Sequence, residues 1–219
     1  MTTHARLLTF GLPALLLTFA PAWGDDKKDD PKKAPATVAK KAERPDPQTL
    51  VGKPAPDIVG KFAINGKAVA LADLKGKVVL VDFWAVWCGP CIATFPHLRD
   101  WNSEFKDKGL EIVGVTSYYK TFDFDKEAGK VKRLQAPLSM EKEQEMLRAF
   151  AAHHKLGHLL MALPDDQRKA AYTAYNVYGI PQAVLIDRKG VIRMVKVGSG
   201  PANAKSLEEE IRKLLDEKA

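Results

Sequence analysis

Cysteine is scarce in this 219-residue chain, which contains only Cys88 and Cys91, both in the stretch FWAVWCGPC at residues 83–91. A structural zinc site usually has four ligands, and no second C-x-x-C is present, so this kind of site has little support. A structural disulfide is also a weak explanation, because closing so short a loop restricts the unfolded chain little. Redox chemistry at the two sulfurs is therefore the favoured interpretation.

The chain also lacks a long run of basic residues, although its formal net charge is +7. Basic and acidic side chains are interspersed, which gives little support for nucleic-acid binding; the surplus favours at most acidic partners or an anionic membrane surface. The composition, 46% hydrophobic and 28% charged, is that of a globular protein. The length fits one domain with accessory segments. We expect a monomer that binds no nucleic acid.

No candidate apolar run near the N-terminus reaches the roughly 20 residues that a membrane-spanning helix needs. The stretch LLTFGLPALLLTFA follows Arg6 and is interrupted by Pro13. Ala20 and Ala22 form an A-x-A arrangement after it, so residues 1–22 are predicted to be a secretory signal peptide, with an uncleaved anchor as the alternative. No cysteine near this segment offers a site for lipid attachment. The mature protein is then expected in the periplasm or cell envelope, where disulfides persist.

Large apolar side chains are almost absent between Asp25 and Pro47, where prolines recur and the charges nearly balance. Such a segment buries too little apolar surface to offset its ordering entropy. We therefore predict a disordered tether over residues 23–47 and one folded domain over residues 48–219. The tether keeps the domain mobile near a membrane, or it is a spacer left by processing.

Two continuous apolar runs predict strands that are covered on both faces. They are VVLVDFWA, residues 78–85, and EIVGVTSY, residues 111–118. A helical stretch between them begins at Gly89 and ends at Gly109. This strand–helix–strand unit is expected to have the right-handed crossover that such units strongly prefer.

Two further features extend this unit. The dipeptide Asn65-Gly66 predicts a hairpin that returns through Val69 to Leu71. Residues 120–157 form an insertion, read as a polar loop followed by a helix that Ser139 caps at its start and Gly157 at its end.

The rest of the domain alternates between strand and helix patterns. In the terminal helix, Ser206 and Glu209 have the spacing of a capping box. The sum predicts an α/β fold, a three-layer sandwich with a mixed central sheet and helices on both faces. The remaining predicted elements are a strand at residues 158–163, a helix at 165–179, strands at 182–187 and 191–198, and the terminal helix.

A cysteine at the start of a helix has a chemical consequence. The helix dipole and the unpaired backbone N–H groups there favour thiolate over thiol. Cys88 holds that position, and Cys91 lies about one turn further in. Cys88 is therefore predicted to attack a substrate disulfide, and Cys91 to resolve the mixed disulfide that results.

The sequence around these cysteines resembles the thioredoxin superfamily. VDFWAVWCGPC is similar to the thioredoxin active-site strand and turn, and Pro96 stands where that family kinks its first long helix. NVYGIPQAVLIDRKG resembles the second signature of the family, with Pro181 at the position of its cis-proline. The N-terminal hairpin, the phrase LADLKGKVVLV, the insertion and the signal peptide resemble the envelope-located TlpA/ResA branch. Thr94 is a departure, because that branch often has glutamate there.

The resemblance implies roles for the residues around the cysteines. Asp82 matches the buried acid that assists proton transfer at the resolving cysteine, and burial in an apolar strand tends to raise the pKa of a carboxyl group. A partly wet structural carboxylate is the alternative for Asp82, and plain packing or turn roles are the alternatives for Trp87 and Pro181. The residues expected to contact substrate are Trp87, Gly89, Pro90, Ile180 and Pro181.

Three histidines, His153, His154 and His158, are the remaining candidates for metal binding. Gly157 is expected to break the helix between the last two, and no fixed acid completes a site. We therefore predict that they belong to the solvated surface and that the protein has no metal site.

The resulting hypothesis is an extracytoplasmic thiol–disulfide oxidoreductase that reduces protein disulfides and needs no cofactor beyond its own cysteines. The resemblance implies disulfide-bearing clients, apocytochrome c among them, and a membrane protein as electron donor. The motif does not set the direction of transfer, so a disulfide donor remains an alternative. A copper-binding or metal-delivery module using the same thiols is a second alternative. A non-catalytic adaptor on the same scaffold would be expected to lose one cysteine or the cis-proline motif. This sequence keeps both, which argues against an adaptor.

Overall fold

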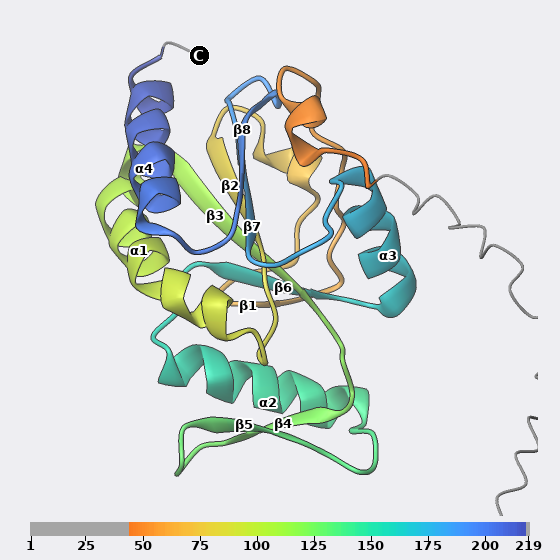
Figure 1. The fold of residues 1–219 in the computed structure, drawn as a ribbon. Coiled ribbons are helices and arrows are strands. Elements are labelled where there is room, and N and C mark those ends of the chain that lie inside the picture. The colour runs from red at the N-terminus through yellow and green to blue at the C-terminus, as the bar shows by residue number, and fades with distance from the viewer. Residues whose placement is uncertain (1–43, 218–219) are drawn as a thin grey trace, which may run out of the picture. The chain divides into compact units, whose positions relative to one another are not determined.

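The computed structural model describes residues 44–217, so the predicted signal peptide and most of the predicted tether lie outside the described residues. Its centre is a six-stranded mixed sheet in the order β1-β6-β3-β2-β7-β8 (Figure 1). Within residues 44–217, no helix is both long enough and apolar enough to cross a membrane. The strands are β1 (Phe62–Ile64), β2 (Val78–Phe83), β3 (Leu110–Ser117), β4 (Phe122–Asp125), β5 (Lys130–Arg133), β6 (Leu159–Leu163), β7 (Gln182–Ile186) and β8 (Ile192–Val197). The helices are α1 (Gly89–Phe105), α2 (Met140–His153), α3 (Asp165–Ala174) and α4 (Pro201–Asp216), with short 3-10 helices at Pro47–Leu50, Leu71–Leu74 and Lys106–Lys108.

Strand β2 lies at the middle of the sheet, as its apolar sequence predicts. All six of its residues are buried, and it pairs with β3 in parallel and with β7 antiparallel. Helices α1 and α4 cover one face of the sheet, and α3 covers the other (Figure 1). The predicted three-layer sandwich is therefore confirmed. One apolar core lies on each side of the sheet, between the strands and the helices that cover them. The strand–helix–strand unit places the cysteines just after the end of β2.

The insertion contains more structure than its sequence predicted. Its first part, expected to be a loop, is a two-stranded sheet in which β4 and β5 pair antiparallel. The Asp125 carboxylate accepts hydrogen bonds from the N–H groups of Glu127 and Ala128, and Gly129 takes a left-handed φ of 63°. These contacts close a tight turn between the two strands. The polar sequence of this segment predicts a loop instead.

The helix of the insertion begins where the sequence placed it but ends earlier. Ser139 is its N-cap, and its hydroxyl accepts a hydrogen bond from the N–H of Lys142. The prediction that Gly157 ends the helix is wrong. The helix stops at His153, and Lys155 takes the left-handed conformation with a φ of 53°.

The predicted N-terminal hairpin is only partly formed. The chain turns at Asn65, but the returning segment makes one isolated bridge, between Val59 and Ala70, and no second strand. Strand β1 pairs instead with β6. The Asn65 side chain explains this choice, because its amide donates hydrogen bonds to the carbonyl oxygens of Leu156 and His158 just before β6. This turn therefore holds β1 against the sheet.

The start of the terminal helix also differs from the prediction. Gly200 is the N-cap of α4 and Pro201 occupies its first turn, as proline often does. Ser206 therefore lies inside the helix, where its hydroxyl donates to the carbonyl oxygen of Ala202. The capping box proposed for Ser206 and Glu209 is wrong, because Pro201 places the helix start six residues earlier.

Candidate active site

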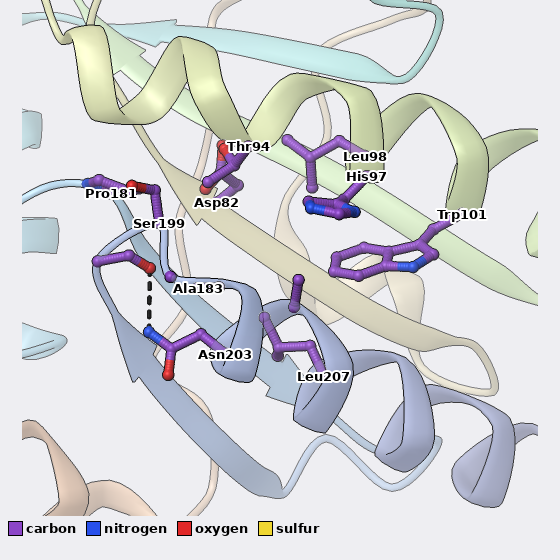
Figure 2. A pocket seen from close by; sticks show the side chains of 13 residues that line it. Asp82, Thr94, His97, Leu98, Trp101, Pro181, Ala183, Ser199, Asn203 and Leu207 are labelled. Carbon is purple, nitrogen blue, oxygen red and sulfur yellow. Dashed lines mark hydrogen bonds between the residues drawn. The ribbon is translucent and has the colours of Figure 1, made fainter.

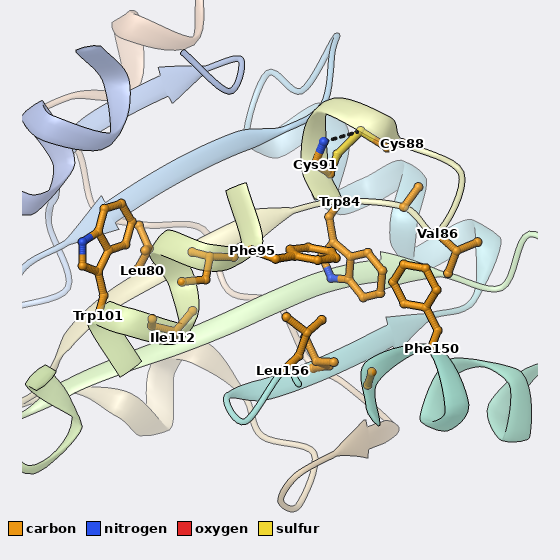
Figure 3. Packing of buried hydrophobic residues seen from close by; sticks show 14 of the residues in the cluster. Leu80, Trp84, Val86, Cys88, Cys91, Phe95, Trp101, Ile112, Phe150 and Leu156 are labelled. Atoms are coloured by element: carbon orange, nitrogen blue, oxygen red, sulfur yellow. Dashed lines mark hydrogen bonds between the residues drawn. A yellow bond between two sulfur atoms is a disulfide. The ribbon is translucent and has the colours of Figure 1, made fainter. Parts of the chain in front are cut away.

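The two cysteines form a disulfide at the start of α1 (Figure 3). Cys88 has extended backbone angles and is the N-cap residue, and its Sγ accepts a hydrogen bond of 3.2 Å from the N–H of Cys91. Gly89 and Pro90 suit this first turn, since proline supplies no N–H where none can be paired within the helix. Cys88 is 4% exposed and Cys91 is fully buried. The first sulfur is thus both closer to the helix dipole and easier to reach.

Asp82 projects from β2 beneath this helix. The residue is 2% exposed, and its Oδ2 has no hydrogen-bond partner among residues 44–217. Burial disfavours the charged form and raises the pKa of Asp82 to about 7. A carboxyl group with this pKa can both release and accept a proton near neutral pH.

Asp82 faces a small cavity between α1, α4 and the start of β7 (Figure 2). The cavity volume of about 30 Å³ is enough for a water molecule. Thr94 lines it from α1, and the Thr94 hydroxyl donates to the carbonyl oxygen of Cys91. Pro181 and His97 also line the cavity. His97 could not be predicted as a site residue, because no motif in the sequence surrounds it. The other lining residues are Leu98, Trp101, Ala183, Gly198, Ser199, Gly200, Asn203, Ala204 and Leu207.

Pro181 is preceded by a cis peptide bond, as its signature predicts. The loop before it is fixed from two sides. The Gln182 side chain donates to the carbonyl oxygen of Tyr175, and the Pro181 carbonyl accepts from the N–H of Gly198. The structure thereby brings Pro181 and Asp82 into one cavity, while Ile180 stays partly exposed on the same loop.

The outer edge of the site is formed by Trp87, Gly89 and Pro90, all exposed. Trp87 is 46% exposed, far more than the cysteine that follows it. Its indole contacts the ring of Tyr119, which directly precedes the insertion, and the ring of Phe122 within the insertion. Neither residue could be predicted from the sequence, because this contact depends on how a chain segment some thirty residues away folds back.

The histidines are not all on the surface. His153 is exposed and His154 is half-buried, but His158 is only 3% exposed, so its predicted solvated position is wrong. Burial lowers the pKa of His158 to about 4, which keeps the imidazole neutral at physiological pH. It is buried because it directly precedes β6, which pairs on both sides. Among residues 44–217, no three histidine, cysteine or acidic side chains are grouped as metal ligands.

Comparisons with known proteins agree with this geometry. Residues 51–195 match the profile of the AhpC/TSA family. Thioredoxin-like protein YneN of Bacillus subtilis (strain 168) is 31% identical over 160 residues, which cover 73% of this chain and 78% of that protein. Thiol-disulfide oxidoreductase ResA of Bacillus thuringiensis subsp. konkukian is 28% identical over 174 residues, covering 75% and 78%.

Solved structures extend the similarity. The thioredoxin domain of a thiol-disulfide oxidoreductase from Bacteroides vulgatus superposes with a TM-score of 0.56 and 28% identity, covering 74% of this chain and 97% of that one. Thiol–disulfide exchange, the reaction that these relatives are named for, needs a cysteine pair such as Cys88 and Cys91, which lie at a helix N-terminus here. The chain belongs to the AhpC/TSA family of the thioredoxin superfamily and is a thiol–disulfide oxidoreductase of the TlpA/ResA type.

Proposed function

We propose that this thiol–disulfide oxidoreductase works outside the cytoplasm and transfers electrons from its dithiol to disulfides in client proteins. The observation that carries this proposal is the position of Cys88, whose Sγ already accepts the Cys91 N–H at the start of α1. In the reduced protein the same N–H and the helix dipole stabilise a thiolate at Cys88. The cell-envelope location rests on the signal pattern in residues 1–22.

In the first step the Cys88 thiolate attacks one sulfur of the client disulfide. A bond forms between Cys88 and that sulfur, and the other client sulfur leaves as a thiolate that takes up a proton. Trp87, Gly89 and Pro90 surround the attacking sulfur on the outside. Ile180 and Pro181 form the facing loop, so the client chain lies between the two segments.

In the second step Cys91 resolves the mixed disulfide. Its thiol must lose a proton before it attacks Cys88 Sγ and expels the second client thiolate. Asp82 is the proposed acceptor, because its pKa of about 7 matches the working pH and the cavity connects it with Thr94 beside Cys91. The client gains two electrons, and the protein ends as the Cys88–Cys91 disulfide.

The cycle then needs an electron donor, since the protein is left oxidised. We propose a membrane protein that passes electrons outward, and no cofactor apart from the redox-active disulfide. Clients are proteins with accessible disulfides, and apocytochrome c is one that the TlpA/ResA resemblance suggests.

Capture of the mixed disulfide tests this proposal. Cys91→Ser cannot complete the second step, so it should accumulate covalent adducts with envelope proteins that dithiothreitol releases. Cys88→Ser with Cys91→Ser is the matched control and should capture nothing. Equal capture by the two variants would contradict the role of Cys88 as attacking sulfur.

A further inference from the structure

Three aromatic rings meet beside the disulfide; one comes from the insertion and one from the residue directly before it. The Tyr119 ring lies edge-on to Trp87, with centroids 5.6 Å apart, and the Phe122 ring lies 6.1 Å from Trp87. Tyr119 and Phe122 are edge-on to each other at 6.4 Å. Aromatic pairs at these separations stabilise each other beyond the area they bury. We call Trp87, Tyr119 and Phe122 the aromatic rim.

The rim stays open to a partner although its rings support one another. Trp87 keeps 46% of its surface exposed, and Tyr119 and Phe122 are half-buried. Scattered exposed apolar residues need no explanation, but three contacting aromatic side chains next to a reacting sulfur form a patch, and such patches mark interaction sites. Trp87 immediately precedes Cys88, so a chain bound at the rim lies beside the attacking sulfur.

A buried carboxylate holds the segment that carries Tyr119. Glu143 on α2 is 1% exposed, and its Oε1 accepts a hydrogen bond of 2.8 Å from the N–H of Lys120. Lys120 has a left-handed φ of 61°, a conformation that non-glycine residues rarely adopt. Its carbonyl accepts from the N–H of Leu138, 2.7 Å away, just before α2. Both backbone polar groups of Lys120 are thus bound to the start of the insertion helix or the residues before it.

Helix α2 is in turn fixed to the core beneath the active site. Phe150 stacks on Trp84 with an interplanar angle of 14° and centroids 5.6 Å apart (Figure 3). Trp84 follows β2 directly, four residues before Cys88. Helix α2 is thus packed on the core through Phe150 and holds the backbone of Lys120 through Glu143. Because Lys120 lies between Tyr119 and Phe122, these contacts position the two rings.

We propose that the insertion builds one wall of the client-binding surface and selects clients with a large apolar side chain next to the reacting cystine. The occupant is an extended client segment whose aromatic or branched aliphatic side chain lies on the aromatic rim. Tyr119 and Phe122 determine this specificity, and Glu143 is a positioning residue that acts through Lys120. The inference rests on the proposed attack of Cys88 on client disulfides.

The character of the neighbouring surface supports this choice of client. Gly89, Pro90 and Tyr178 are exposed and uncharged, and Tyr178 is 43% exposed close in sequence to Ile180. Charged side chains are depleted where partners bury their contact core, and aromatic ones are enriched. A basic flanking residue on the client would lose hydration here and gain no ion pair with these residues, whereas the exposed Lys120 next to Tyr119 offers a partner only to an acidic one.

The test compares three disulfides in single-turnover reactions with the reduced protein. Two are short peptide dimers joined through one cystine, with either tryptophan or alanine beside each cysteine, and the third is bis(2-hydroxyethyl) disulfide. Rates over a range of concentrations separate half-saturation from the limiting rate. Burying one large side chain corresponds to a factor of about ten, so the wild type should prefer the tryptophan peptide about tenfold, through half-saturation.

Variants then locate the source of the preference. Tyr119→Ala and Phe122→Ala should each reduce it several-fold, and Glu143→Ala should do so while Glu143→Gln, which keeps an acceptor oxygen, restores it. Val59→Ala removes a 55% exposed apolar side chain elsewhere and should leave the preference unchanged.

The outcomes separate this inference from the proposed function. A wild type without preference, or the wild-type preference in both Tyr119→Ala and Phe122→Ala, would overturn the inference while reduction itself continues. If the reduced wild type reacts with none of the three disulfides, the proposed function fails. Thermal unfolding of each variant shows that the loss of preference occurs in folded protein.

Discussion

Two buried acids serve the two parts of this site in different ways. Asp82 belongs to the central strand, faces a cavity, and has one oxygen without a partner among the described residues. Glu143 belongs to the insertion; its Oε2 also has no partner among the described residues, but its Oε1 accepts a backbone N–H. Burial raises the pKa of both, but for Glu143 the hydrogen bond from the N–H of Lys120 opposes that effect.

The difference shows what burial of a carboxyl group can indicate. A buried acid without a compensating hydrogen bond destabilises the fold when it is ionised. The position of Asp82, beside a cavity and near the resolving cysteine, points to proton transfer. A buried acid that holds a backbone N–H, as Glu143 does, is explained by the conformation it fixes. We therefore propose that the first acts in the reaction and that the second shapes the client surface.

The largest expected effect is the loss of activity in Cys88→Ala, which leaves both buried acids in place. Cys88→Ala removes the attacking sulfur, so reduction of insulin with dithiothreitol should fall to the uncatalysed rate. In this background, Asp82→Asn should still change stability but no longer change activity. Retention of most of the activity in Cys88→Ala would rule out the role assigned to that sulfur.

Asp82→Asn should stabilise the protein at pH 8 and slow resolution of the mixed disulfide. The folded protein holds the Asp82 proton up to about pH 7, whereas the unfolded chain releases it near 3.8. Stability from this group is therefore complete below about pH 4 and is lost as the pH rises through 7. The difference between the two pKa values corresponds to at most about 4 kcal/mol.

Urea unfolding of wild type and Asp82→Asn at pH 4, 6 and 8 measures this effect. The difference between the two proteins isolates Asp82 from His158, whose lowered pKa acts in the opposite direction below pH 6.5. A stability difference that does not change between pH 4 and pH 8 would show that Asp82 titrates normally.

Substitutions of Glu143 should have the smallest effect and the opposite sign. Glu143→Ala leaves the N–H of Lys120 without its acceptor, which costs about 1–3 kcal/mol in free energy of unfolding. Glu143→Gln keeps the acceptor and should lose less. Thermal unfolding at pH 7 compares the three proteins. A Glu143→Ala variant that is as stable as wild type would remove the distinction between the two acids.

The parts of the site that local patterns specify could be predicted from the sequence. A continuous apolar run gives β2 its central place, and Gly89-Pro90 after it starts the helix that Cys88 caps. Asp82 stands out because an acid inside such a run has no solvent to face. Each of these signals is contained within a few neighbouring residues.

The parts that depend on distant segments could not be predicted. Tyr119 and Phe122 reach Trp87 only because the chain at the start of the insertion folds back toward the start of α1. Glu143 lies in a helix rich in charged residues, where nothing local distinguishes the one acid that is buried. His158 was likewise assigned to the surface, since its burial follows from the pairing of β6 with strands far away in the sequence.

The reduction potential of the Cys88–Cys91 couple tests the central claim most directly. The turn between the cysteines carries no charge or histidine, so the helix terminus is the main stabiliser of the thiolate, by at most about 2 kcal/mol. This moderate stabilisation predicts a potential below roughly −200 mV, on the side of thioredoxin rather than of a strong oxidant. Equilibration in glutathione buffers, followed by fluorescence of Trp84 and Trp87, measures it. A value near about −120 mV would contradict the account and make this protein a disulfide donor.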